Sequence, residues 1–133
     1  SVNGRVALDL DLGTDTVLLV LDQASPCGLI LNELISNALK HAYPGERGGA
    51  LRVQLRQQNE TVTIRVSDDG VGLPQGFDEE RDGNLGLELV RMLVGQLDGH
   101  IERTGPPGVT YLLTFERIKH SVHGADERPR SGG

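Results

Sequence analysis

The sequence is poor in aromatic residues and in cysteine, and it lacks any long hydrophobic run. It has no Trp, two Phe and two Tyr among 133 residues, so its core must be built from Leu, Val, Ile and Ala. Cys27 is the only cysteine, which excludes an internal disulfide bond and a cysteine-based zinc site and fits a reducing, cytoplasmic location. No apolar run reaches the ~20 residues of a membrane span, and no signal peptide is visible. Membrane anchoring of the full-length protein would therefore need segments outside this chain.

Basic residues are also in deficit. Thirteen Lys and Arg stand against 19 Asp and Glu, which gives a net charge of −6. Broad nucleic-acid binding needs a basic surface that displaces counterions, so no nucleic-acid partner is expected. A nucleotide is not excluded, because a few local donors and a metal ion suffice to bind it. The length fits one domain, and the start at Ser1 without Met indicates a piece of a longer protein.

The apolar periodicity predicts six strands and two helices. Strands are expected at 5–12, 51–56, 62–68 and 109–115, where apolar and polar residues alternate, at the more continuously apolar segment 16–21, and at the short segment 100–103. Helices are expected at 25–43 and 85–97. The first two strands are expected to form a hairpin, and the first helix to begin at Ser25 and Pro26 and to end near Pro44 and Gly45. The predicted fold class is α+β, a two-layer sandwich in which helices cover one face of a mixed, mainly antiparallel sheet. The polar, aperiodic tail from about residue 119 is expected to be disordered.

The first predicted helix has a polar row opposite an apolar face. At 100° per residue the apolar face is predicted to consist of Leu31, Ile35, Ala38, Leu39 and Ala42. The opposite row consists of Glu33, Asn37, Lys40 and His41. A carboxylate can orient or deprotonate a hydroxyl, an amide oxygen can ligate Mg²⁺, and a lysine can meet a phosphate. Taken alone, however, the row also fits an ordinary solvated helix face.

A second candidate lies at the end of the fourth predicted strand. By alternation, Asp68 follows three apolar residues on the core side of the strand, while Asp69 points outward. A buried carboxylate needs hydrogen-bond donors, and adenine offers an exocyclic amine where guanine offers a carbonyl. Gly70 and Gly72 remove Cβ atoms where a base or ribose would approach the backbone. The alternative is a simple turn after a strand.

A third candidate is the start of the second predicted helix. Gly83, Asn84 and Gly86 lie where a polar loop of about ten residues, 75–84, leads into the helix. The first turn of a helix has free N–H groups and positive dipole character, which favour phosphate. The alternative is a glycine hinge or cap, and the pattern matches neither the dinucleotide fingerprint nor the P-loop.

Together the three segments form a recognisable set. Residues 32–42 (NELISNALKHA), 68–74 (DDGVGLP) and 84–90 (NLGLELV) resemble the N box and the two glycine boxes of the ATPase superfamily of DNA gyrase, heat-shock chaperones, MutL and histidine kinases. The residue pattern of these segments is most similar to that of the short-lid sensor histidine kinases of two-component systems. The resemblance covers about residues 5–118 and implies a Bergerat-fold catalytic domain at 1–118, followed by the tail at 119–133.

The resemblance also implies roles for single residues. Asn37 matches the Mg²⁺ ligand and Asp68 the acid that reads adenine, with Gly70 and Gly72 beside it. Glu33 matches the acid that acts as base or orients the attacking group. The remaining positions implied to contact the nucleotide are Lys40, His41, Asn84, Leu85 and Gly86. The implied cofactors are ATP and Mg²⁺.

Three departures from the family pattern stand out. The lid is short and lacks a Phe-rich box, Asn84 stands where a glycine is common, and Val109 stands where a base-contacting Thr is frequent. The neighbouring Thr110 points the other way by alternation.

The implied function is to supply the γ-phosphoryl group of ATP to a histidine. That histidine would lie on a dimerisation domain of the same protein, absent from this chain, and a response regulator would be an indirect partner. Two alternatives remain open at this stage: a serine kinase of the anti-sigma type, and a nucleotide-sensing pseudokinase module without transfer. No direct membrane contact by this chain is expected.

Overall fold

The computed structural model describes residues 6–14, 16–41, 48–72, 76–78 and 83–119, and the structural statements below refer to these ranges. Along the chain, one strand precedes the first helix, and each helix is followed by two strands. In order, they are β1 (Val6–Asp11), α1 (Leu21–His41), β2 (Gly49–Gln58), β3 (Thr61–Asp68), α3 (Leu85–Gln96), β4 (His100–Thr104) and β5 (Val109–Glu116). Neither helix is long and apolar enough to cross a membrane.

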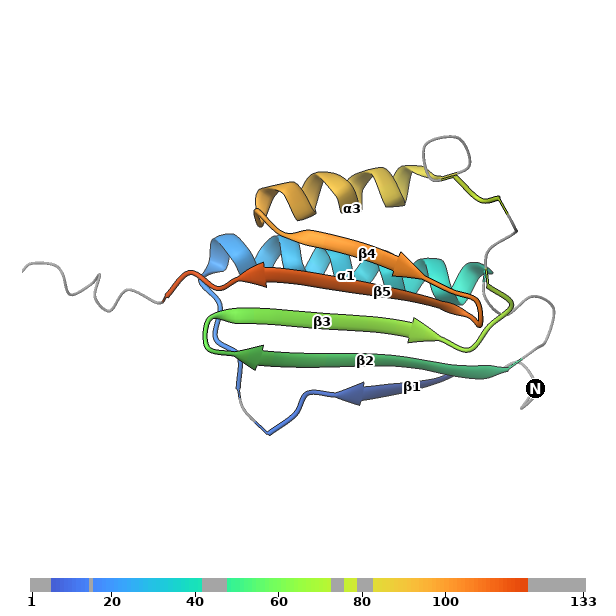
Figure 1. Cartoon of the computed structure of the whole chain (residues 1–133), viewed down its shortest axis with the longest axis horizontal. Helices are drawn as coiled ribbons and strands as arrows, with labels where there is room; N and C mark the ends of the chain where they lie inside the picture. Colours follow the sequence, from blue (N-terminus) through green and yellow to red (C-terminus); the bar gives the residue numbers. More distant parts are fainter. Residues whose placement is uncertain (1–5, 15, 42–47, 73–75, 79–82, 120–133) are drawn as a thin grey trace, which may run out of the picture.

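The strands form one sheet in the order β1-β2-β3-β5-β4. β1 runs parallel to β2, and the other neighbouring strands are antiparallel. Both helices lie on the same face of the sheet (Figure 1). The α+β class and the two-layer arrangement are therefore confirmed.

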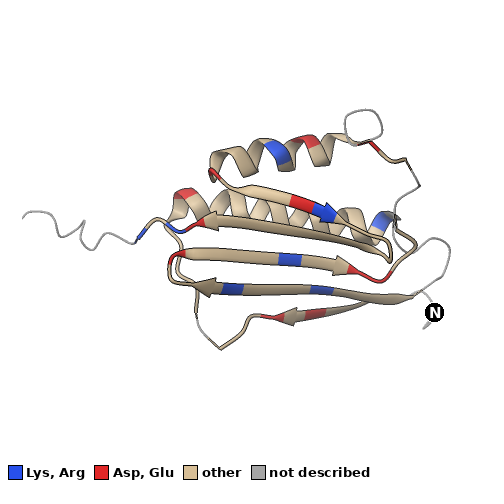
Figure 2. Cartoon of the chain, in the orientation of Figure 1, with Lys and Arg blue, Asp and Glu red and all other residues tan. Residues whose placement is uncertain are grey.

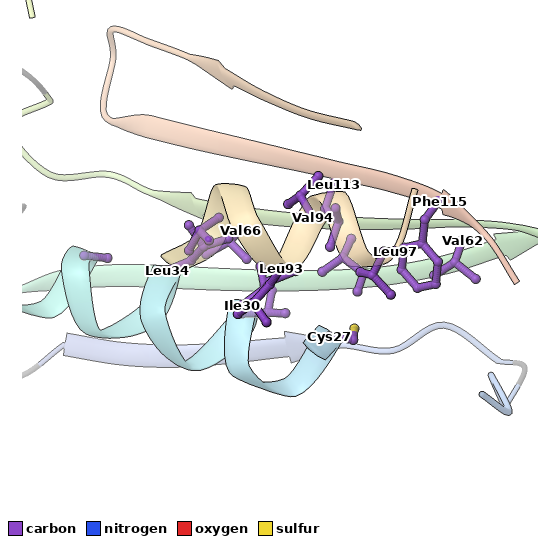
Figure 3. Close-up of a cluster of buried hydrophobic side chains, with 14 of the residues drawn as sticks. Cys27, Ile30, Leu34, Val62, Val66, Leu93, Val94, Leu97, Leu113 and Phe115 are labelled. Carbon is purple, nitrogen blue, oxygen red and sulfur yellow. The ribbon is translucent and has the colours of Figure 1, made fainter. Parts of the chain in front are cut away.

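The core lies between the two helices and the central strands. Figure 3 shows side chains of α1 and α3 meeting those of β3 and β5. The largest fully buried side chains are Ile30, Leu51, Val62 and Leu113. Burial also raises the pKa of the Cys27 thiol to about 11, so this cysteine serves as a small apolar core residue.

The predicted second strand at 16–21 is wrong. Residues 16–20 have no regular structure, and α1 begins at Leu21 rather than at Ser25, with Pro26 inside the helix. Gln23 gives the physical reason, because its buried amide ties the first turn of α1 to the end of β5. Its Nε2 donates to Glu116 O at 2.9 Å, and its Oε1 accepts from Ile118 N at 2.8 Å. Val17 and Leu19, just before α1, pack on the rim of the core instead of pairing with another strand.

The first predicted strand forms, but not as part of a hairpin. β1 pairs with β2, with Leu8 opposite Leu51 and Asp11 opposite Gln54. Figure 2 shows acidic positions on β1 and basic positions on the neighbouring β2, and their side chains form ion pairs. Asp11 contacts Arg52 at 3.1 Å and Arg56 at 2.8 Å, and the hydrogen bond from Arg56 lowers the pKa of Asp11 to about 2. Exposed ion pairs contribute little to stability, so the pairing depends mainly on the backbone ladder.

The apolar face of α1 is rotated relative to the prediction. The buried stripe consists of Cys27, Ile30, Leu34 and Ala38. The predicted Leu31 and Ile35 are only half-buried, Leu39 is 51% exposed, and Ala42 lies outside the described residues. The reason is that α1 packs against α3 as well as the sheet, so the direction of burial lies between these two neighbours.

The ends of the later elements agree with the prediction to within two residues. The described part of α1 ends at His41, so the expected stop at Pro44 and Gly45 lies outside the described residues, as does nearly all of the tail after residue 118.

Candidate functional site

Four segments that are distant in sequence come together at one end of the molecule. The C-terminal end of α1, the start of α3, the end of β3 and the turn between β4 and β5 all lie on the right in Figure 1. Three of these four segments were singled out from the sequence. The fourth, the β4–β5 turn, was not.

Asp68 is held in one orientation at the end of β3. Its Oδ1 accepts hydrogen bonds from Gly70 N at 2.9 Å and from Val109 N at 3.2 Å. The side chain is half-buried on the same side as the buried Val66, as alternation predicted, while Asp69 is exposed. Within the described ranges, no hydrogen bond to Asp68 Oδ2 is present. This carboxylate therefore presents one acceptor oxygen in a fixed direction.

The β4–β5 turn supports Asp68 from the other side. Gly108 has φ 59, and a Cβ built on it would overlap Asp68 O. Gly72 faces the same turn, where a Cβ would lie 3.4 Å from Gly108 O. Sequence reasoning missed Gly108 and the donor role of Val109. The GPPG turn at 105–108 was visible, but nothing in the sequence placed it next to a residue some 40 positions away.

The polar row of α1 meets the start of α3. Asn84 is the N-cap of α3, and its Oδ1 accepts from Leu87 N at 2.8 Å. Its Nδ2 donates to Asn37 Oδ1 at 3.3 Å. A Cβ built on Gly86 would overlap Glu33 Oε1. Glycine at this position therefore lets the carboxylate of α1 lie against the first turn of α3, where positive dipole character favours an anion.

The remaining predicted residues surround this junction. Lys40 is exposed one turn beyond Asn37, Leu85 is 80% exposed, and Gly83 is half-buried. The side chain of His41 lies outside the described residues.

One further contact in this region was missed from the sequence. The guanidinium of Arg103 on β4 lies 5.0 Å from the ring centre of Phe77, a residue of the predicted lid. This contact joins the lid segment to the sheet.

The side-chain oxygens at this end are suitable ligands for a magnesium ion that arrives with a nucleotide. No cluster of three or more His, Cys, Asp or Glu side chains able to hold a metal occurs in the described part of the chain. Mg²⁺ keeps several waters and takes one or two protein oxygens plus substrate phosphates, so a complete protein cage is not required. The Asn37 amide oxygen, with the Glu33 carboxylate one turn earlier, fits this requirement.

Comparison with known proteins gives a consistent family. The model of the histidine kinase-, DNA gyrase B-, and HSP90-like ATPase family matches residues 22–119. Blue-light-activated histidine kinase 2 of Erythrobacter litoralis is 33% identical over 133 residues, which cover 97% of this chain and 38% of that protein. The sensor histidine kinase PdtaS of Mycobacterium tuberculosis is 37% identical over 89 residues, which cover 65% of this chain and 18% of that protein. This chain thus spans well under half of these relatives.

Solved structures agree with the fold. The histidine kinase domain of the Erythrobacter litoralis EL346 blue-light-activated kinase superposes with a TM-score of 0.77 at 28% identity, covering 86% of this chain and 52% of that one. The catalytic domain of the histidine kinase ThkA superposes with a TM-score of 0.70 at 18% identity, covering 84% of this chain and 80% of that one. At that identity the second likeness concerns the fold alone.

Proposed function

This chain belongs to the histidine kinase-, DNA gyrase B-, and HSP90-like ATPase family as a histidine kinase-type catalytic ATPase domain, and we propose that it binds ATP with Mg²⁺ and presents the γ-phosphoryl group to a histidine. The observation that carries the proposal is that the Asp68 carboxylate, fixed by two N–H donors, lies at the end of β3, while Glu33 and Asn37 contact the start of α3 at the same end of the fold. Recognition of an adenine nucleotide requires one group that hydrogen-bonds to the base and a set of groups that bind the phosphates and their metal ion.

Asp68 is proposed to read the base. Because Gly70 N and Val109 N hold its Oδ1, the other oxygen is left to accept from the exocyclic amine of adenine. Guanine would place a carbonyl there and be repelled. Gly70 and Gly72 keep the backbone beside the base free of side chains.

The junction of α1 and α3 is proposed to hold the phosphates. The first turn of α3, around Leu85 and Gly86, supplies N–H groups, and the exposed Lys40 supplies a cation. Asn37 would hold Mg²⁺, which, when bound, supplies neutralisation of the phosphate charge. His41 is proposed to flank the nucleotide from the end of α1.

Glu33 is proposed to orient the attacking group or to accept its proton. Its carboxylate lies against Gly86 at the start of α3, beside the proposed phosphate position, and this closeness supports a role toward a nucleophile that approaches the γ-phosphate. Phosphoryl transfer depends mostly on positioning and electrostatics, so a correctly placed carboxylate suffices for this role.

The acceptor is proposed to be a histidine on a dimerisation domain of the same cytoplasmic protein, with a response regulator receiving the phosphoryl group afterwards. The relatives named above are histidine kinases, which favours this acceptor over a serine substrate. Neither nucleic acid nor direct membrane contact forms part of the proposal.

Calorimetry with ATP, ADP and GTP, each with and without Mg²⁺, tests the proposed function. We expect ATP and ADP to bind, GTP to bind about tenfold more weakly or worse because one hydrogen bond is replaced by a repulsive pair, and Mg²⁺ to tighten ATP binding. Equal binding of ATP and GTP, or no nucleotide binding at all, would contradict the proposal.

A further inference from the structure

Asn84 makes two hydrogen bonds in different directions, and together they determine which atoms face each other. Its Oδ1 accepts from Leu87 N, a group that can only donate, so the oxygen of the Asn84 amide must lie on that side. The amide nitrogen then necessarily faces Asn37. Because that nitrogen can only donate, the atom that Asn37 turns toward it must be Oδ1, at 3.3 Å. The Leu87 N–H donor thus fixes the orientation of the Asn84 amide, and the Asn84 amide in turn fixes the orientation of the Asn37 amide.

These two hydrogen bonds determine which amide atom of Asn37 is positioned to bind a ligand. An asparagine amide can turn either its oxygen or its NH₂ group toward a neighbour, and only the oxygen can ligate Mg²⁺. The carbonyl oxygen has two lone pairs, and the bond from Asn84 uses one of them. The other remains available for a ligand.

We infer that Asn84 is a positioning residue for the metal rather than a residue that contacts the nucleotide. It fixes Oδ1 of Asn37 at the junction of α1 and α3, so that the oxygen is already in place before Mg²⁺ arrives. The inference rests on the proposed function, since it assigns Asn37 to the metal. It also gives the departure from glycine at position 84 a role that glycine, without a side chain, cannot fill.

The capping role and the positioning role of Asn84 can be separated by substitution. Serine is as good an N-cap as asparagine, but its hydroxyl ends where the Asn84 side chain has its Cγ, so it cannot reach Asn37. Asn84→Ser therefore keeps the cap and removes the link, whereas Asn84→Ala removes both. Asn32→Ser, at an exposed position of α1, is the matched control.

The experiment measures ATP binding by calorimetry as a function of Mg²⁺ concentration, together with thermal unfolding. We expect Asn84→Ser to keep the melting temperature and the Mg²⁺-free ATP affinity. The Mg²⁺ concentration for half of the metal-dependent gain should rise about fivefold, the ratio that corresponds to one ordinary hydrogen bond. Asn84→Ala should show the same metal effect with a lower melting temperature, and Asn32→Ser should show neither.

The inference is overturned if Asn84→Ser has wild-type Mg²⁺ dependence while Asn84→Ala does not, because the cap alone would then matter. A lower Mg²⁺ requirement in Asn84→Ser would also overturn it, since the link would then compete with the metal. In an Asn37→Ala background, the further change Asn84→Ser should have no effect on Mg²⁺ dependence. If the wild-type chain binds no ATP, the proposed function fails and the inference fails with it, a result distinct from normal binding with unchanged metal dependence.

Discussion

Asp68 and Glu33 are both assigned to the proposed site, yet their surroundings differ and suit different proposed roles. Two backbone N–H groups hold Asp68 in one direction, which suits a residue that distinguishes one base from another. The side chain of Glu33 makes no hydrogen bond or ion pair with any residue that the structure describes, and it lies against Gly86 at the start of α3. A carboxylate that can change rotamer suits a group that meets a mobile nucleophile.

Asp68→Asn tests the base reader. The substituted amide can still accept from Gly70 N and Val109 N through its oxygen, so the fold should be retained. Its NH₂ group would then face the amine of adenine, two donors opposite each other, and the ATP affinity should fall roughly 10- to 100-fold. GTP should lose less, because its base carbonyl can accept from the new donor. Calorimetry checks both nucleotides.

Asp69→Asn is the control for this substitution. Asp69 is adjacent in sequence but exposed, and its Oδ1 accepts from Ala50 N at 2.9 Å on the other side of the strand. ATP affinity should be unchanged in this variant. Unchanged ATP affinity in Asp68→Asn itself would refute the assignment of the base pocket.

Glu33→Gln separates binding from chemistry. The substitution keeps the shape of the side chain and removes its negative charge, so ATP should bind as well as before or slightly better. Phosphoryl transfer to an added histidine-bearing dimerisation domain should fall roughly 100-fold, the usual contribution of a general base. A variant that transfers at the wild-type rate would exclude Glu33 from the reaction. Radiolabel transfer from ATP provides the measurement.

At the level of secondary structure, the proposed phosphate and metal site lies at the junction of α1 and α3. An N-cap, a glycine and an amide–amide hydrogen bond bring the two helices together at one point. These features belong to the pair of helices, since neither helix alone positions Glu33 or Asn37.

Gly86→Ala tests this junction without a large cost in stability. The new Cβ would overlap the end of the Glu33 side chain, which can rotate away, and alanine favours the helix by about 0.5–1 kcal/mol. The melting temperature should therefore stay level or rise slightly, while phosphoryl transfer is strongly reduced because Glu33 is displaced.

Gly95→Ala on the same helix is the matched control for Gly86→Ala. Nothing lies within 4 Å of a Cβ at position 95, so this variant should gain the same helix stabilisation and keep its activity. Equal activity in both variants would show that the close approach at Gly86 has no functional importance.

The elements also show how far sequence reasoning reached. Strict alternation predicted β3 and β5 and the core-side position of Asp68, because a half-buried strand leaves a period of two in the sequence. The motif at 84–90 placed the start of α3 correctly.

What the sequence could not reveal depends on contacts between distant segments. Residues 16–20 are mostly apolar like a buried strand, but they have no partner strand, and Val17 and Leu19 pack on the rim of the core. Gln23 extends α1 toward its N-terminus through bonds to the end of β5, far away along the chain. The pairing of Asp68 with Val109 N, and of Asn37 with Asn84, likewise exists only once the sheet and helices are assembled.

At the scale of the whole molecule, the order of the strands in the sheet brings the parts of the proposed site together. β5 lies between β3 and β4, so the β4–β5 turn comes to lie beside the end of β3. The helices on the same face bring their facing ends to that place (Figure 1). The opposite, outer face of β1 and β2 carries paired charges and none of the proposed site residues.

The nucleotide site at this one end of the fold is tested most directly by backbone amide NMR of the wild-type chain during titration with ATP and Mg²⁺. We predict that the large shift changes fall in four segments, 33–41, 68–72, 84–87 and 105–109, while the amides of Arg52 and Arg56 on the outer face remain unchanged. Shift changes concentrated on the outer face, or absent from the end of β3 and the start of α3, would contradict the account.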